Sequence, residues 1–432
     1  MSFAVFTPSP PAAGRLRRRA RLSPTRLLWC VYALFFVSGV AQSAIVPLLP
    51  RLAGMFGLSP SETALLLALP GLATLAVSVP AGLAADRFGA RRATLAAGLL
   101  LCASCLAQST PSLALLLAGR IAFGISFGVI WTTGMAWLSE IDTATKGGRL
   151  GPSVTCSSVG LMIGPAVGGI FAQRAAVGLP FELIAAAAAL VTVSLALGSG
   201  PERARRSSPP LGLARQESGG GRAALATHTS IGSLVRLLRR PGVGAAAGGL
   251  VVSGAVSSAS QLLITLGLHR YGLSTGRIGL AFSAAAVCYI VVSASILRLG
   301  ARACTLRFNA LATLALGLAL VPAVAGGGPP VLLLALMLTA LPRAAISTIA
   351  YSLASDPESA SGGGEGFVFG MLNGAWAGAM VLTPLLAGAL DQHDGARAGY
   401  LAVIVPSCAI AGWLIAHSRP GRTRIAATGA GH

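Results

Sequence analysis

Two arginines, Arg120 and Arg343, lie well inside long apolar stretches of the chain. A guanidinium can bind a carboxylate or phosphate through two parallel hydrogen bonds, whereas burying it without a partner costs several kcal/mol. Neither stretch holds an acidic residue in its core that could neutralise its arginine. We therefore expect cavity water, backbone carbonyls or an anionic group of a bound molecule to compensate each charge, and we hypothesise a substrate that carries or can acquire negative charge.

Other patterns associated with chemistry are weak. Cys102 and Cys105 have C-x-x-C spacing, but no second pair or nearby histidine cluster completes a zinc site, so we interpret them as small apolar helix residues. Residues 124–128 spell G-x-S-x-G, which as a nucleophile elbow requires a strand–turn–helix context that an apolar helix does not provide. Lys146 precedes two glycines and belongs to no Walker A pattern. We expect no enzyme, no metal and no cofactor.

The composition indicates that membrane helices position the two arginines. Of 432 residues, 54% are hydrophobic and only 10% are charged, against about 25% charged residues in an average soluble domain. The net charge of +20 suits nucleic acid or an anionic membrane surface. The apolar content favours the membrane, and the basic segments lack the interleaved aromatic residues of a nucleic-acid surface.

Apolar runs predict an all-α integral membrane protein. A helix that crosses a bilayer needs about 20 mostly apolar residues. The chain contains twelve such runs: 27–49, 63–84, 93–108, 113–138, 154–172, 181–197, 243–266, 278–297, 305–324, 331–353, 367–390 and 400–416.

The distribution of positive charge orients these spans. With the N-terminus inside, 25 Lys and Arg residues fall on the inner side and five on the outer side, so we expect both termini in the cytoplasm and the protein in the cell membrane. A long polar linker, 199–240, separates the sixth and seventh spans. Its last part, 230–240, alternates apolar and basic positions, which predicts either a surface helix on anionic lipid or an ordinary basic flank. The expected parts are a cytoplasmic basic tail (1–26), a six-helix half (27–198), a cytoplasmic linker with its surface helix (199–240), a second six-helix half (241–417) and a cytoplasmic tail (418–432).

Short repeats indicate that the two halves arose by internal duplication. The matching segments are 37–39 with 252–254 and 57–59 with 272–274 at an offset of 215, 87–91 with 298–302 at 211, and Pro165 and Gly169 with Pro384 and Gly388 at 219. Short matches whose offset drifts by a few residues are typical of a six-helix duplication with changes in loop length.

The turn between the second and third spans carries a specific motif. Its defined positions are Gly82, Asp86, Arg87, Gly89, Arg91 and Arg92. It resembles the signature loop G-x-x-x-D-R/K-x-G-x-R/K-R/K of the major facilitator superfamily (MFS) at each of these positions. The resemblance implies the MFS fold and a conformational latch, in which Asp86 pairs with Arg91 and the N-terminus of the eleventh helix to close the cytoplasmic side. In the second half Leu297 replaces the aspartate, so we expect a latch in one half only.

The fifth span carries Gly160, Gly164, Pro165, Gly168 and Gly169. These residues resemble the pattern g-x-x-x-G-P-x-x-G-G of antiporter branches of the superfamily, and the chain is most similar in pattern to the twelve-span drug:proton antiporter-like branch. Glycines four residues apart allow helices to approach closely, and the proline bends its helix. The motif indicates export by exchange.

The resemblance also implies that spans 1, 4, 7 and 10 line a substrate cavity, and Arg120 and Gly124 resemble the family's intramembrane arginine motif. Because spans 4 and 10 are equivalent under the duplication, we expect Arg120 and Arg343 to approach the cavity from opposite halves. The predicted polar lining is Ser38, Gln42, Arg120, Ser253, Ser257, Gln261 and Arg343, with Asn373 and Trp376 from the eleventh span.

The predicted function is secondary active transport by alternating access, exporting a small hydrophobic or amphipathic organic compound. Proton coupling is an open question, because no acidic residue falls at mid-span; it could use Asp86, Glu182 or a proton of the substrate, or be absent. One alternative is an importer of small organic anions on the same fold, and another is a membrane sensor that does not transport. The expected partners are the substrate, protons and lipids, without nucleic acid, for a monomer.

Overall fold

The computed structural model describes residues 24–141, 150–174, 176–198, 235, 237–299, 304–354 and 365–418. Every regular element in this part of the chain is helical, and twelve of its helices are long and apolar enough to cross a membrane. The predicted helical class and the predicted number of spans are therefore confirmed.

The helices fall into two sets. The first set is α1 (Pro24–Ala44), η1 (Val46–Leu48), α2 (Leu49–Phe56), α3 (Pro60–Phe88), α4 (Ala90–Ser109), α5 (Leu113–Ile141), α6 (Leu150–Arg174) and α7 (Leu179–Gly198). The second set is α10 (Pro241–Ala259), the π-helix η2 (Ser260–Ile264), α11 (Thr265–Arg270), α12 (Thr275–Leu299), α13 (Leu306–Leu318), α14 (Val321–Ala325), α15 (Pro329–Ala354), α16 (Glu365–His393) and α17 (Ala396–His417).

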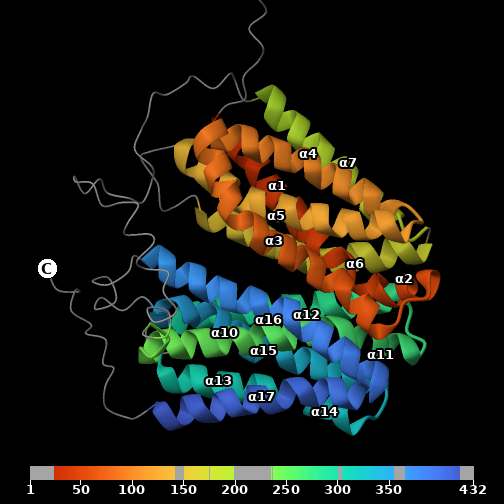
Figure 1. Ribbon diagram of the computed structural model, residues 1–432, viewed down its shortest axis with the longest axis vertical. Helices are drawn as coiled ribbons and strands as arrows, with labels where there is room; N and C mark the ends of the chain where they lie inside the picture. The colour runs from red at the N-terminus through yellow and green to blue at the C-terminus, as the bar shows by residue number, and fades with distance from the viewer. Residues whose placement is uncertain are drawn as a thin grey trace, which may run out of the picture.

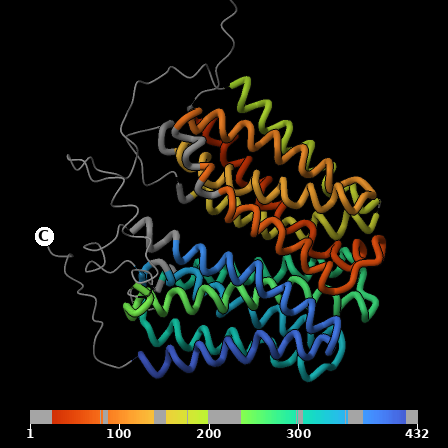
Figure 2. Tube along the Cα trace, viewed as in Figure 1, coloured from red at the N-terminus to blue at the C-terminus, as the bar shows by residue number. Residues whose placement is uncertain are grey.

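Each set forms its own bundle with six membrane-crossing helices, here called the N-bundle (α1–α7) and the C-bundle (α10–α17) (Figure 1). The Cα trace passes from red to yellow-green in one bundle and from green to blue in the other (Figure 2). This arrangement confirms the predicted division into two six-helix halves.

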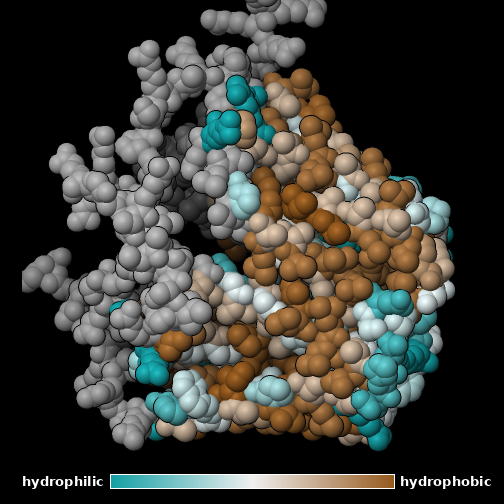
Figure 3. Space-filling model, in the orientation of Figure 1, coloured by the Kyte–Doolittle hydropathy of each residue, from teal (hydrophilic) through white to brown (hydrophobic). Residues whose placement is uncertain are grey.

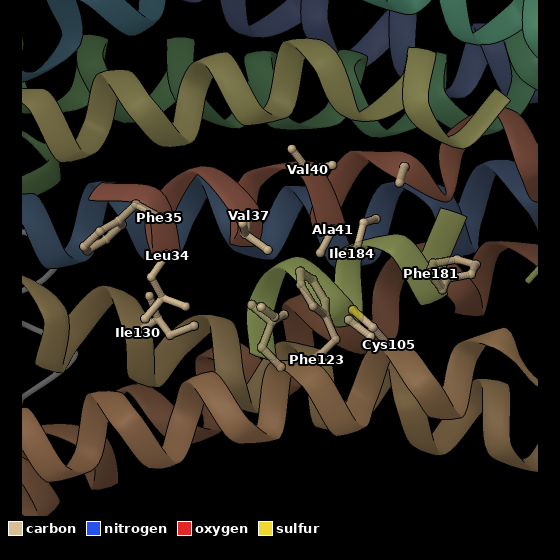
Figure 4. Packing of buried hydrophobic residues seen from close by; sticks show 14 of the residues in the cluster. Leu34, Phe35, Val37, Val40, Ala41, Cys105, Phe123, Ile130, Phe181 and Ile184 are labelled. Carbon is tan, nitrogen blue, oxygen red and sulfur yellow. The ribbon is translucent and has the colours of Figure 1, made fainter. Parts of the chain in front are cut away.

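Each bundle packs its own apolar core. In the N-bundle the three largest fully buried side chains are Phe35 of α1, Phe123 of α5 and Phe181 of α7. Figure 4 shows Leu34 of α1 pointing toward Ile130 of α5, with Phe123 and Cys105 nearby. A separate cluster around Val256, Leu316 and Leu336 fills the C-bundle.

The outer surface is also apolar. Leu190, Leu382 and Val405 are among many large hydrophobic side chains that are mostly exposed. Apolar residues cover the middle of the view in Figure 3, and hydrophilic residues gather at its lower right edge. Backbone groups satisfied within helices, together with an apolar outer surface, are what a bilayer requires.

Several helices depart from the predicted limits for local reasons. The first span does not end near Leu49, because η1 and α2 continue its path to Phe56. The ninth span is interrupted between α13 and α14, where Pro322 occupies the first turn of α14. Between α3 and α4 the chain turns at the single residue Gly89, whose φ of 89° favours glycine, as the signature loop predicts.

Candidate functional site

The two bundles contact each other through α6 with α12 and α3 with α16. On α6, Gly169 lies directly against the Thr275 carbonyl of α12, and Thr275 donates its hydroxyl hydrogen bond to the Gly169 carbonyl (3.3 Å). One turn along α12, Gly279 lies against the Pro165 carbonyl. Pro165 and Gly169 of the antiporter-type motif therefore contact the opposite bundle.

The α3–α16 contact repeats this arrangement. A Cβ at Gly388 of α16 would lie 2.7 Å from the Pro60 carbonyl of α3. The offsets seen in the sequence relate Gly388 to Gly169 and Pro60 to Thr275. Both contacts therefore use the same positions of the duplicated halves, which supports the duplication independently of the short repeats.

A pair of glutamines crosses the interface in the same symmetric way. The Gln173 side-chain carbonyl of α6 accepts a hydrogen bond from the Gly276 amide of α12 (3.1 Å). The Gln392 side-chain carbonyl of α16 accepts one from the Ser61 hydroxyl of α3. Gln173 and Gln392 are 219 residues apart, the offset of the fifth and eleventh spans. Sequence analysis missed this pair, although the offset would have found it.

All of these contacts lie toward the end of the molecule that carries α2 and α11, here called the α2/α11 end. On α6 and α16 they involve the C-terminal halves of the helices, and on α3 and α12 the first turns. Toward the other end the two bundles diverge (Figures 1 and 2), and a recess is visible between them in Figure 3. The protein is thus closed at the α2/α11 end.

A polar cluster lies at mid-depth in the C-bundle. Arg343 of α15 donates from Nη1 to the Ser257 hydroxyl of α10 (2.9 Å) and stacks on the Tyr289 ring of α12, 5.1 Å from its centre. The Gln261 side-chain amide, in the π-helix η2, donates to the same hydroxyl (3.4 Å). The predicted residues Arg343, Ser257 and Gln261 therefore meet, while Tyr289 was not foreseen, since an aromatic residue in an apolar run carries no distinct signal.

Arg343 and two exposed leucines lie on opposite sides of α15. Leu338 and Leu341 are exposed, and Arg343 follows Leu341 by two residues, about 200° around the helix. The Arg343 side chain is nonetheless partly exposed. Its exposed part therefore lies on the side of α15 that faces Ser257 of α10 and Tyr289 of α12.

Arg120 has a different environment. It is only 3% exposed, its Nε donates to the Leu66 carbonyl of α3 (2.7 Å), and its guanidinium stacks on Phe123 at 5.5 Å. The expectation that Arg120 and Arg343 approach one cavity from opposite halves is therefore not met for Arg120 in this conformation. Its guanidinium links α5 to α3 inside the N-bundle. A backbone carbonyl therefore compensates part of its charge, which is one of the three possibilities expected from the sequence.

The duplication pairs Arg343 with a different residue. The first residues of α5 and α15, Leu113 and Pro329, are 216 positions apart. At that offset Arg343 corresponds to Phe127, which forms a tilted aromatic contact with Trp131 (centres 6.0 Å apart). Phe127 and Trp131 are both partly exposed. By this alignment, α5 carries partly exposed aromatic side chains, packed at the edge of the N-bundle core, where α15 carries Arg343.

The other predicted cavity residues divide into two groups. Ser38 and Ser253 are buried, and the Ser38 hydroxyl donates to the Phe35 carbonyl of its own helix (2.8 Å). Gln42 is partly exposed, and Asn373 and Trp376 are exposed. Asn373 lies on the opposite side of α16 from the exposed Leu382 and Leu386, since nine residues correspond to about 180°.

The remaining glycines of the antiporter-type motif pack against α1. A Cβ at Gly164 would lie 2.6 Å from the Val40 carbonyl, and Gly160 and Gly168 contact the Phe36 and Ala44 carbonyls. Glycines at i, i+4 and i+8 thus let α6 and α1 pack backbone to backbone. One motif serves two interfaces, one within the N-bundle and one between the bundles.

The signature loop is described in part. Arg87 is exposed and stacks on Phe88 (5.3 Å), and Arg91 and Arg92 follow the Gly89 turn in the first turn of α4. The side chains of Gly82 and Asp86 lie outside the described residues, as does the beginning of the polar linker up to residue 234. The latch therefore stays a prediction.

A buried carboxylate of the C-bundle is paired with an arginine. Arg270 of α11 binds Asp391 of α16 through two hydrogen bonds of 3.1 and 2.8 Å, and the Asp391 side chain is 1% exposed. Glu182, the carboxylate proposed from the sequence for coupling, is exposed in the first turn of α7.

Comparison with known proteins identifies the family. The profile described as Major Facilitator Superfamily matches residues 31–364, and the chain therefore belongs to the major facilitator superfamily. It is a multi-pass membrane protein with the fold of a secondary transporter.

Curated relatives share shorter segments. The chain is 30% identical over 186 residues to the MFS-type transporter ppzB of Metarhizium rileyi (strain RCEF 4871), covering 41% of this chain and 38% of that protein. It is 35% identical over 134 residues to the MFS-type transporter C18.02 of Schizosaccharomyces pombe (strain 972 / ATCC 24843), covering 29% of this chain and 30% of the relative. The matched segments thus span well under half of each relative, and these relatives are named as transporters rather than enzymes.

Solved structures share the fold across nearly the whole chain. A bacterial homologue of the human lysosomal transporter Spinster, inward-facing and unoccupied, aligns with a TM-score of 0.70 at 13% identity, covering 93% of this chain and 99% of that one. A POT family transporter in complex with 5-aminolevulinic acid aligns with a TM-score of 0.66 at 16% identity, covering 91% and 95%. At these identities the likeness concerns the fold.

Proposed function

We propose that the protein exports a small amphipathic organic compound across the cell membrane by alternating access. The observation that carries this proposal is the set of symmetric contacts at the α2/α11 end. Few hydrogen bonds and no described ion pair join the bundles there, and buried apolar contacts such as that of Ala64 with Leu262 and Leu266 complete the interface. The bundles can therefore separate without breaking strong polar bonds. Rigid halves that rock about a central site are the expected machinery of such a transporter.

The orientation belongs to the same proposal. With both termini in the cytoplasm, the α2/α11 end faces outward and the open end faces the cytoplasm, as loading for export requires. Reporter fusions at Ser208 and His432 should both report cytoplasm. A periplasmic or extracellular signal from either fusion would contradict the orientation.

The direction of transport rests on the antiporter-type motif of α6. Proteoliposomes loaded with a panel of labelled amphipathic acids, amides and amines should release at least one of them faster than empty-vector controls. An imposed pH gradient that changes this rate would support proton exchange, and an unchanged rate would indicate facilitated diffusion. Failure of every compound to move faster than in control liposomes would contradict transport.

Import of small organic anions is a second candidate. The partly exposed Arg343, without a described acidic partner, favours an anionic cargo over a cationic one. The same liposomes test the direction of transport. Import would appear as uptake of labelled compound from outside, whereas export would appear as release of the loaded compound.

A further inference from the structure

The Arg343 cluster offers hydrogen-bond donors that the protein does not use. Nη1 is bonded to the Ser257 hydroxyl, but the buried Nε has no acceptor among the described residues. Because the Ser257 oxygen accepts from both Arg343 and Gln261, the Ser257 hydroxyl proton is left to donate elsewhere. A guanidinium and a hydroxyl that converge with spare donors suit an acceptor with several lone pairs.

No carboxylate in the described part of the chain neutralises Arg343, since the acid of the C-bundle that pairs with an arginine, Asp391, is bound to Arg270. The Tyr289 ring face offsets part of the charge. Arg120 has a different setting: it is nearly fully buried and donates from Nε to a backbone carbonyl, although its Nη1 also has no acceptor among the described residues. Arg343 differs in two respects, because its side chain is partly exposed and because it bonds a side-chain hydroxyl that has a proton of its own to donate.

The position of the cluster matches that of a substrate site. Arg343 lies 14 residues into the 26-residue helix α15, about 21 Å along its axis. Gln261 lies in the π-helix η2, and single π turns are frequent at functional sites. At the equivalent place the N-bundle presents Phe127 and Trp131, and the buried Trp131 indole nitrogen has no acceptor among the described residues.

We propose that Arg343 and Ser257 bind the carboxylate, sulfonate or phosphate group of an amphipathic anion whose apolar part lies against Phe127 and Trp131. This inference rests on the proposed function and assigns its substrate class. The two bundles then contact different parts of the substrate. The C-bundle selects the charge, because the planar guanidinium binds an oxyanion through two hydrogen bonds. The N-bundle accepts the apolar part with little demand on its shape, because the aromatic faces offer no directional polar groups apart from the indole N–H.

The test compares three probes that share one ring system: 1-naphthoate, 1-naphthamide and 1-naphthylmethylammonium. Binding to the purified full-length protein in nanodiscs of zwitterionic lipid is measured by isothermal titration calorimetry. The wild-type protein should bind naphthoate at least about tenfold more tightly than the amide and the ammonium, as a charge-assisted bidentate contact implies. Equal affinities for the three probes, or no binding of naphthoate, would overturn the proposal.

Variants locate the preference. Arg343→Gln should bring the naphthoate-to-amide affinity ratio close to one. Arg343→Lys keeps the charge but loses the paired donors of the planar guanidinium, so its ratio should lie between those of the wild type and of Arg343→Gln. Arg277→Gln is the matched control, because Arg277 is exposed at the start of α12 and should keep the wild-type ratio. Phe127→Ala should weaken all three probes by a similar factor. Retention of the preference in both Arg343 variants would overturn the assignment, and folding of each variant is checked by its elution as a single species.

Two further measurements complete the test. One distinguishes a soluble anion from a lipid headgroup, and the other distinguishes failure of the anion site from failure of the proposed transport function. Adding phosphatidylglycerol to the nanodiscs should leave naphthoate binding unchanged for a soluble substrate. Displacement of naphthoate would support the anion site and assign it to an anionic lipid headgroup. In proteoliposomes, binding of naphthoate without transport of any probe would contradict the proposed function and leave the site intact. Transport of the amide or ammonium in preference to naphthoate would overturn the site and leave the transport function standing.

Discussion

Replacing the two interface glutamines together, Gln173→Leu with Gln392→Leu, should open the α2/α11 end. Each side chain accepts one hydrogen bond from the opposite bundle, Gln173 from Gly276 and Gln392 from Ser61. Leucine keeps a similar size and removes the acceptor. The bonds exist only while the bundles are in contact, so their loss destabilises the closed state and leaves the open state unchanged.

The magnitude follows from the two bonds. A neutral hydrogen bond contributes a net stabilisation of about 1 kcal/mol, and each 1.4 kcal/mol changes an equilibrium about tenfold. One substitution should therefore raise the ratio of open to closed protein about fivefold. The two bonds share no partner, so their effects should add, and the double variant should raise the ratio about 30-fold.

Spin labels at Met55 and Tyr271 measure this ratio, because both side chains are exposed near the α2/α11 end, one in each bundle. Double electron–electron resonance in a cysteine-free background should show the longer distance gaining population. Gln108→Leu is the matched control, since Gln108 donates to the Ser104 and Gly119 carbonyls within the N-bundle. A rise of less than about threefold in the double variant, or an equal rise in the control, would refute the reasoning.

Three further predictions concern stability and gating. Gly164→Ala should lower the free energy of unfolding of the purified protein by about 1–3 kcal/mol, because the added Cβ would meet the α1 backbone. Gly54→Ala is the control, since Gly54 has open space around it. Equal stabilities of the two variants would contradict this packing argument. Arg270→Ala should destabilise the protein more than Asp391→Ala. Removing Arg270 leaves the buried Asp391 carboxylate without its cation, whereas removing Asp391 leaves an arginine that is 52% exposed and can be solvated. Thermal unfolding that ranks the two variants in the opposite order would refute this asymmetry. Asp86→Asn should lower the transport rate in proteoliposomes while expression stays near normal, and transport at the wild-type rate would exclude the latch.

The membrane architecture could be predicted from local sequence. A bilayer demands about 20 apolar residues for each crossing helix, so the span count depends on composition along the chain and not on which helices pack together. The duplication was also visible, because equivalent segments keep a nearly constant offset. The structure extended this evidence to Gln173 and Gln392, which obey the offset but carry no motif of their own.

Helix packing was predictable in kind but not in partner. Glycines four residues apart predict a close approach of two helices, and such an approach occurs along α6. Only the tertiary structure decides that Gly160, Gly164 and Gly168 contact α1 while Gly169 contacts α12 of the other bundle. Adjacent positions on one helix point about 100° apart, and the sequence does not state which neighbour lies in each direction.

The sequence by itself determined that two cations lie at depth in apolar helices, and only the tertiary structure decided what each one does. Aligned at the first residues of α5 and α15, Arg343 corresponds to Phe127, which lies seven residues from Arg120, or about 10 Å along the helix. Predicted helix limits are uncertain by several residues, so the sequence does not fix the depth of a side chain. Seven residues make nearly two full turns, so Arg120 and Phe127 lie on the same face of α5 and differ in depth. Depth within each bundle, and the neighbours packed there, placed one guanidinium against the Leu66 carbonyl and left the other partly exposed beside Ser257 and Tyr289.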